Sequence, residues 1–202
     1  MRENVIAMIV VVACAMAFVS PIQAQKKTEI GVKGGLGFAN LTGDVSDNKS
    51  MLCFGGGGLF RFSPSPQFSI QPEVLLVLKG AKYEDGYDSE KVKLTYIEVP
   101  VLAMYRPPTG GKVSPSFFAG PAISLLISAK AGDEDIKDEM NSTDLGLVFG
   151  AGVDFETGAK GKISLDGRYT MGISNIVKDS SDNSVRNGVF FLGVNYIFPL
   201  GQ

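Results

Sequence analysis

The chain has 202 residues, and 19 Lys and Arg against 21 Asp and Glu give it a net charge of −2 at pH 7, which argues against a basic groove for nucleic acid. Histidine is absent, and this excludes Ser-His-Asp and Cys-His catalysis and nearly all metal sites that contain histidine. With 45% hydrophobic residues and 25 glycines, the composition is typical of one folded domain made of short strands and turns, either globular or membrane-embedded.

Residues 1–24 have the features of a secretory signal peptide. Arg2 precedes an apolar run over residues 5–19, and Ala24 provides the small residue that a cleavage site requires. The run is shorter than the roughly 20 apolar residues of a membrane-spanning helix. We therefore predict cleavage after Ala24, which leaves residues 25–202 as the mature domain.

An alternative interpretation of the same segment is a lipoprotein signal, with Cys14 as the lipidated residue. The apolar run continues past Cys14, where a lipoprotein usually becomes polar, so this alternative is weaker. In either case Cys53 is left without a partner inside the mature domain, and an internal disulfide is not expected.

Beyond Gln25 the apolar residues recur with a period of two, which indicates strands rather than helices. The alternation predicts eight strands, at 28–41, 51–62, 67–80, 92–106, 115–130, 143–156, 162–175 and 187–199. The connections alternate between short turns and long polar loops, and the long loops are 42–50, 81–91, 131–142 and 176–186. This pattern predicts an all-β fold, an eight-stranded antiparallel up-and-down transmembrane β-barrel.

Ten charged strand residues fall on the face opposite the large apolar residues, which separates a membrane barrel from a soluble one with an apolar lumen. An eight-stranded barrel has an interior that side chains fill, so five cations and five anions inside it require a paired, hydrogen-bonded network. The predicted network of the lumen is Lys33, Arg61, Glu73, Lys79, Glu98, Arg106, Asp154, Glu156, Asp166 and Arg168.

Aromatic residues on the apolar face favour the same interpretation, because rings collect where a membrane meets water. Beside the short turns and the end of the last strand we predict a girdle of Phe60, Phe62, Phe68, Tyr105, Phe117, Phe155 and Phe198. At the other rim the candidates are fewer, Phe38 and Phe54.

Six segments carry a family resemblance, and they are Gly31–Leu41, Gln71–Leu75, Lys79–Tyr83, Tyr96–Pro100, Phe118–Pro121 and Asp166–Tyr169. They resemble the PorT-like outer membrane protein beta-barrel domain family, and the resemblance covers essentially all of 28–199. The resemblance implies an eight-stranded barrel in the outer membrane of a Gram-negative bacterium. We expect the long loops to be extracellular and the termini periplasmic. We also expect contact with outer-membrane lipid and, during biogenesis, with the barrel-assembly machinery.

Other patterns could carry chemistry, but each has a simpler explanation. Glu73 and Glu98 could act as a general acid and base, yet partners in the ion-pair network are the better interpretation. The glycine run 55–58 is not followed by the helix and Lys-Ser/Thr pair of a phosphate-binding loop, which favours close backbone packing. Cys53 has no basic activator near it in the sequence.

The long loops are acidic, most densely at 133–139, where calcium could bind to carboxylates. The spacing does not match an EF-hand, and solvated charge is the simpler explanation, so we expect no cofactor and no metal site. We expect a non-enzymatic structural or interaction protein of the cell envelope, whose loops contact partner proteins. The alternatives are a narrow solute pore and an accessory factor of a secretion or assembly machine.

Overall fold

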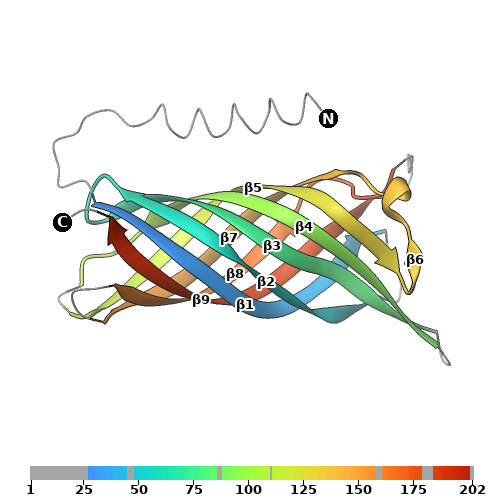
Figure 1. Cartoon of the computed structure of the whole chain (residues 1–202), viewed down its shortest axis with the longest axis horizontal. Helices are drawn as coiled ribbons and strands as arrows, with labels where there is room; N and C mark the ends of the chain where they lie inside the picture. The colour runs from blue at the N-terminus through green and yellow to red at the C-terminus, as the bar shows by residue number, and fades with distance from the viewer. Residues whose placement is uncertain are drawn as a thin grey trace.

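The computed structural model describes residues 27–44, 48–85, 88–109, 111–157, 161–178 and 184–200 (Figure 1). The predicted signal peptide, residues 1–24, lies outside the described residues. Within the described part of the chain, no helix is both long and apolar enough to cross a membrane.

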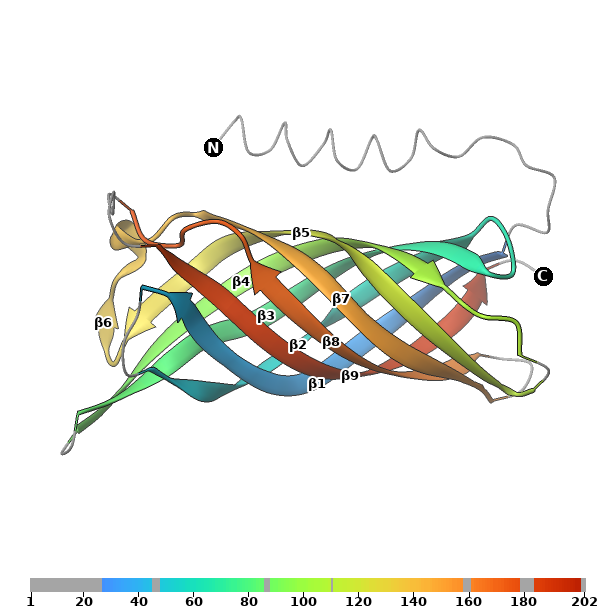
Figure 2. The same ribbon diagram turned by 180° about the vertical axis from the view of Figure 1, so that it is seen from behind.

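The structure is a closed antiparallel β-barrel, as the alternation predicted (Figures 1 and 2). The barrel strands are β1 (Lys27–Gly43), β2 (Asn48–Ser63), β3 (Phe68–Asp85), β4 (Asp88–Tyr105), β5 (Val113–Ala131), β7 (Thr143–Glu156), β8 (Lys162–Gly172) and β9 (Val185–Leu200). Each of these eight strands pairs with the next one in this order, so that β5 pairs with β7, and the pairing of β1 with β9 closes the wall.

One end of the barrel carries the short turns, the start of β1 and the end of β9, and we call it the turn side. The other end, the loop side, carries the longer connections. There the link from β5 to β7 contains the two-residue strand β6 (Glu134–Asp135) and the 3-10 helix η1 (Lys137–Glu139). Both lie at the same end as the tip of the β3–β4 hairpin, which projects beyond the wall (Figure 1).

The predicted loop at 81–91 is wrong. β3 continues to Asp85, β4 begins at Asp88, and the two strands stay in register from Leu75 opposite Glu98 to the tip of the hairpin. The predicted loop 42–50 is likewise shortened, because β2 begins at Asn48. The apolar alternation ends where the strands leave the apolar band, but backbone pairing needs no apolar residues and continues beyond it.

Side chains alternate along each strand between a buried inner face and an exposed outer face. On the outer face large apolar residues are about half exposed, for example Val32 (59%), Leu76 (54%) and Val194 (56%). Such a surface around the whole wall is far larger than a soluble monomer exposes. The inner face instead buries charged and polar side chains, so the arrangement is inverted relative to a soluble barrel.

Candidate functional site: the filled lumen and the loop side

Four charged side chains form the ion-pair group in the middle of the lumen. Arg168 donates two parallel hydrogen bonds to Glu73, from Nη1 to Oε2 at 2.8 Å and from Nη2 to Oε1 at 3.0 Å. Lys33 Nζ lies 2.9 Å from Asp166 Oδ2 and 3.4 Å from Glu73 Oε1. Each of the four residues is at most 8% exposed. A bidentate arginine–carboxylate pair fixes orientation as well as charge, so this group joins β1, β3 and β8 rigidly.

A second group lies toward the turn side and is centred on Arg61. Its Nη1 donates to Asp154 Oδ2 at 2.8 Å, and its Nε donates to Gln71 Oε1 at 2.6 Å. Arg106 Nη1 donates to Ser69 Oγ at 2.7 Å, and its Nε lies 3.7 Å from Asp154 Oδ2. These contacts link β2, β3 and β7 across the barrel.

Glu29 completes the turn-side group. Its Oε1 lies 2.9 Å from Lys162 Nζ, and its Oε2 lies 3.8 Å from Arg61 Nη1. Glu29 is 1% exposed, so its charge is compensated by neighbours rather than by water.

The third group lies toward the loop side, around Lys79. Its Nζ is 2.7 Å from Glu98 Oε2 and 3.4 Å from Asp144 Oδ2, and it lies 4.9 Å from the centre of the Tyr96 ring. Asn187 Nδ2 donates to Asp144 Oδ2 at 2.9 Å. One cation therefore holds two carboxylates on different strands.

The structure buries nine of the ten residues predicted for the lumen network, namely Lys33, Arg61, Glu73, Lys79, Glu98, Arg106, Asp154, Asp166 and Arg168. Glu156, the tenth, is exposed at the last position of β7, where the strand reaches the rim and its inward side opens to water.

Sequence analysis missed Lys162, the partner of Glu29, and two buried carboxylates of the network, Glu29 and Asp144, which are 1% and 2% exposed. Both could have been found from parity, because Glu29 shares its face with Lys33, and Asp144 shares its face with Asp154. Each was overlooked because it stands near a strand end.

Apolar side chains fill the spaces between the ion-pair groups. One cavity between the inward-facing side chains, next to Val189 and Phe191, holds only about 10 Å³, which is room for no more than one water molecule. The ring of Phe191 lies close to Gly35 and Gly55, where a Cβ would stand 2.6 and 3.3 Å from it. This packing explains part of the glycine content: the ring needs strands without side chains beneath it.

At the loop side an apolar cluster closes the barrel. It combines strand residues with Met140 and Ile176, which come from the two connections beside β7 and β8. The buried members are Leu41, Ala81, Leu94, Tyr96, Leu126, Ala129, Met140 and Ile176.

The same two connections are joined to each other by backbone pairing. Met140 and Val177 form an antiparallel bridge, Asn141 N donates to Ile176 O at 2.8 Å, and Lys178 N donates to Glu139 O at 2.9 Å. The Asn141 side chain adds a hydrogen bond to Asn175 O at 3.0 Å. These bonds join the β5–β7 and β8–β9 connections into one surface at the loop side, which we call the loop platform. It presents the exposed acidic segment 133–139.

Glu73 and Glu98, the possible acid–base pair, belong to different ion-pair groups and are each held by a lysine. The thiol of Cys53 is buried in an apolar cluster. Among the described residues there is no group of three or more His, Cys, Asp or Glu placed to hold a metal ion.

All seven predicted girdle residues lie on the outer face, where Phe62 is half-buried and the others are exposed. Two ring contacts occur on the turn side, between Phe68 and Tyr105 at 5.2 Å and between Tyr196 and Phe198 at 4.6 Å. Toward the loop side the outer face has more rings than Phe38 and Phe54. Phe38 pairs with Phe190, and cross-strand pairing continues the row through Tyr169 to Phe149.

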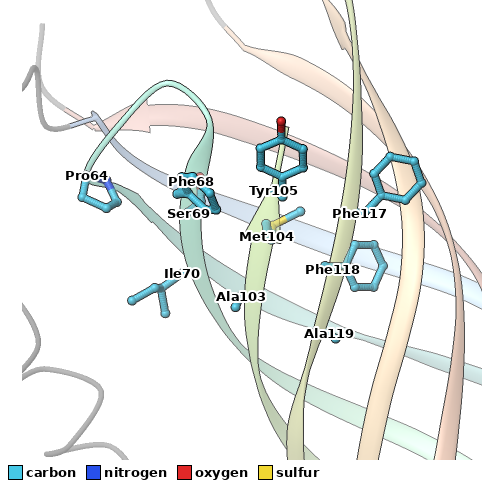
Figure 3. Close-up of a pocket in the computed structure, with 10 residues that line it drawn as sticks. All are labelled: Pro64, Phe68, Ser69, Ile70, Ala103, Met104, Tyr105, Phe117, Phe118 and Ala119. Atoms are coloured by element: carbon cyan, nitrogen blue, oxygen red, sulfur yellow. The ribbon is translucent and has the colours of Figure 1, made fainter. Parts of the chain in front are cut away.

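The outer wall has a groove near the turns, between β3, β4 and β5 (Figure 3). The groove holds about 490 Å³ and exists because Ala103 and Ala119 stand between larger side chains. Its lining is Pro64, Phe68, Ser69, Ile70, Ala103, Met104, Tyr105, Phe117, Phe118 and Ala119. The groove is part of the apolar wall.

Comparisons with known proteins agree with this geometry. The model of the outer membrane protein beta-barrel domain family matches residues 23–178. Neisserial surface protein A is 18% identical, with a TM-score of 0.55 over 83% of this chain and 96% of that one. A major outer membrane protein from Thermus thermophilus is 14% identical, with a TM-score of 0.57 over 88% and 100%. No curated protein matches the sequence.

Proposed function

Because this chain belongs to the outer membrane protein beta-barrel domain family, we propose that it is a sealed anchor that presents the loop platform at the surface of a Gram-negative cell. The outer membrane follows from the family. The role as a structural and interaction protein, and the outward orientation of the loop side, are the steps that the proposal adds.

The observation that carries the proposal is the filled lumen. Three ion-pair groups and an apolar cluster occupy the interior, and the cavity next to Phe191 is only about 10 Å³. A diffusing solute would have to displace buried, mutually compensated charges, which is costly in the interior of a protein. A closed barrel of this kind is suited to fixing a surface in the membrane. The platform is such a surface, because its two connections are joined by backbone pairing and carry exposed side chains.

The first prediction concerns conduction, which separates the anchor from a narrow solute pore. Reconstituted in planar lipid bilayers, the mature protein is expected to give no current steps, because its lumen is occupied by side chains. The comparison is a double variant, Arg168→Ala with Glu73→Ala, which removes the bidentate pair from the middle of the lumen. Current through this variant would show that the measurement can detect an open lumen. Regular current steps from the natural protein would favour the pore.

The second prediction concerns orientation. Glu134 on the platform and Lys112 beside a short turn are both exposed, and either can be replaced by cysteine, since Cys53 is buried and gives little background. With a membrane-impermeant maleimide on intact cells, Glu134→Cys is expected to be labelled and Lys112→Cys to be labelled only after the outer membrane is broken. The reverse result would place the turn side outside and contradict the proposal.

A further inference from the structure

Five lysines form a row on the outside of the barrel at its loop side, across β2, β3, β4 and β5. Lys49 pairs with Lys82, Lys82 pairs with Lys91, and Lys93 pairs with Lys130. Lys91 and Lys93 are two residues apart on β4, so they share its outer face. Four of the side chains are exposed and Lys82 is partly exposed.

The row lies at the edge of the apolar wall. On β3, β4 and β5 the lysines stand on the loop side of outward-facing apolar residues that are exposed, and these residues are Leu76, Ile97 and Ile127. This boundary is where the hydrocarbon of a membrane gives way to headgroups. A lysine can bury its flexible stem along the apolar wall and raise its ammonium group to that level.

The row is confined to one half of the wall. In the described strand residues of the other half, β1, β7, β8 and β9, the outer face toward the loop side holds a single cation, Arg186, which pairs with Thr42. Among the contacts of the described residues, the acidic connection meets the row where Asp135 on β6 pairs with Lys130 and where Gly132 N donates to Lys91 O at 3.1 Å. The asymmetry gives the barrel one cationic side.

Like charges directly opposite each other in a sheet destabilise it unless other groups compensate them, and this row contains three lysine–lysine pairs. An anion that lies across several lysines would turn this cost into attraction, and phosphate binds lysine well. Clusters of basic residues beside a membrane bind anionic lipid headgroups for the same reason.

We propose that the lysine row binds the phosphate groups of a phosphorylated glycolipid in the leaflet at the loop side. In the cell this leaflet is the outer one if the orientation in the proposed function holds, so the biological part of the inference rests on that orientation. The binding itself depends only on the lysines and on the phosphates.

The test uses the mature protein in nanodiscs of neutral phosphatidylcholine, titrated with diphosphoryl lipid A. The test variant is Lys91→Gln with Lys93→Gln, which removes the centre of the row. The control is Lys112→Gln, an exposed lysine at the turn side. We expect the natural protein and the control to bind equally and the double variant to bind about tenfold more weakly or worse. Binding should also weaken as salt is raised.

Equal binding by the natural protein and the double variant would overturn the proposal, and so would equal binding of lipid A from which the phosphates have been removed. Thermal unfolding provides a second readout with opposite signs. Without lipid A the double variant should melt no lower than the natural protein, because a like-charge repulsion is relieved. With lipid A it should melt lower. A lower melting temperature in both conditions would show that the lysines only support the fold.

Both leaflets of a nanodisc accept lipid A, so this experiment does not depend on orientation. Reversed maleimide labelling in cells would therefore refute the proposed orientation and leave the lysine site intact. If the natural protein and the double variant bound lipid A equally, the lysine site would be refuted and the proposed orientation would be unaffected.

Discussion

Glu73 accepts hydrogen bonds from three side chains in the middle of the lumen, those of Lys33, Gln71 and Arg168. Two of these partners are cations, and both are at most 5% exposed. Removing one partner of a buried pair is far more damaging than never having had the pair, because the other charge remains in a place without water.

We therefore expect Glu73→Ala to lower the free energy of unfolding by about 3–5 kcal/mol, measured by urea titration of the protein refolded in vesicles. The matched control is Glu156→Ala, which removes the same side chain from an exposed position and should change the value by less than about 0.5 kcal/mol. Similar losses in both variants would show that the buried network does not stabilise the barrel.

The comparison between these two glutamates also shows what parity can and cannot predict. Alternation along a strand gave the inward face of β7 correctly, including Asp154. It could not give the depth at which that face meets water, so Glu156 was assigned to the lumen although it stands at the rim. Depth depends on the tilt of the strands and on where neighbouring strands end, and neither is a local property of the sequence.

In β1 two adjacent glycines have opposite surroundings. At Gly35 a Cβ would stand 2.6 Å from the ring of Phe191 and would also collide with the backbone oxygen of Leu192. At Gly34 a Cβ would meet nothing within 4 Å, because that position faces outward. The segment needs glycine at one of these positions and merely has it at the other.

Gly35→Ala is therefore expected to destabilise the barrel by about 1–3 kcal/mol, since either the ring or the strand must move. Gly34→Ala should leave the stability unchanged or raise it slightly, because alanine loses less conformational entropy than glycine on folding. The same urea titration measures both. If the two variants lost equal stability, the packing of Phe191 over β1 would not be the reason for the glycine.

Six of the eight predicted strands begin and end within three residues of the observed ones. The other two, β3 and β4, extend further toward the loop side than predicted. The prediction relied on an apolar face, and the segment Ala81–Asp85 has almost none. Such strands form because each supplies the backbone partners of the other, which becomes visible only when the register between them is known.

Considered as a whole, the molecule places its apolar surface outside and its charges inside. In water this arrangement would leave half-exposed rings and aliphatic side chains around the entire wall. The fold is therefore stable only where hydrocarbon or detergent covers that wall.

We expect the mature chain, residues 25–202, to refold in detergent and to migrate on a gel as a compact, fast band that shifts to a slower position on boiling. The closed hydrogen-bonded wall resists the gel detergent until heat opens it. In buffer without detergent the compact band should be absent. A protein that reached the same compact state without detergent would contradict the inverted arrangement of its faces.

The pairing of β1 with β9 has a consequence for synthesis and quality control. These strands are the first and last of the barrel, and their register runs from Thr28 opposite Leu200 to Gly43 opposite Val185. A chain that stopped before β9 would carry two open sheet edges, and hydrocarbon has nothing with which to satisfy them. The barrel can therefore close only after β9 has been made, and we expect copies that end before β9 to remain outside the membrane, where proteases can reach them.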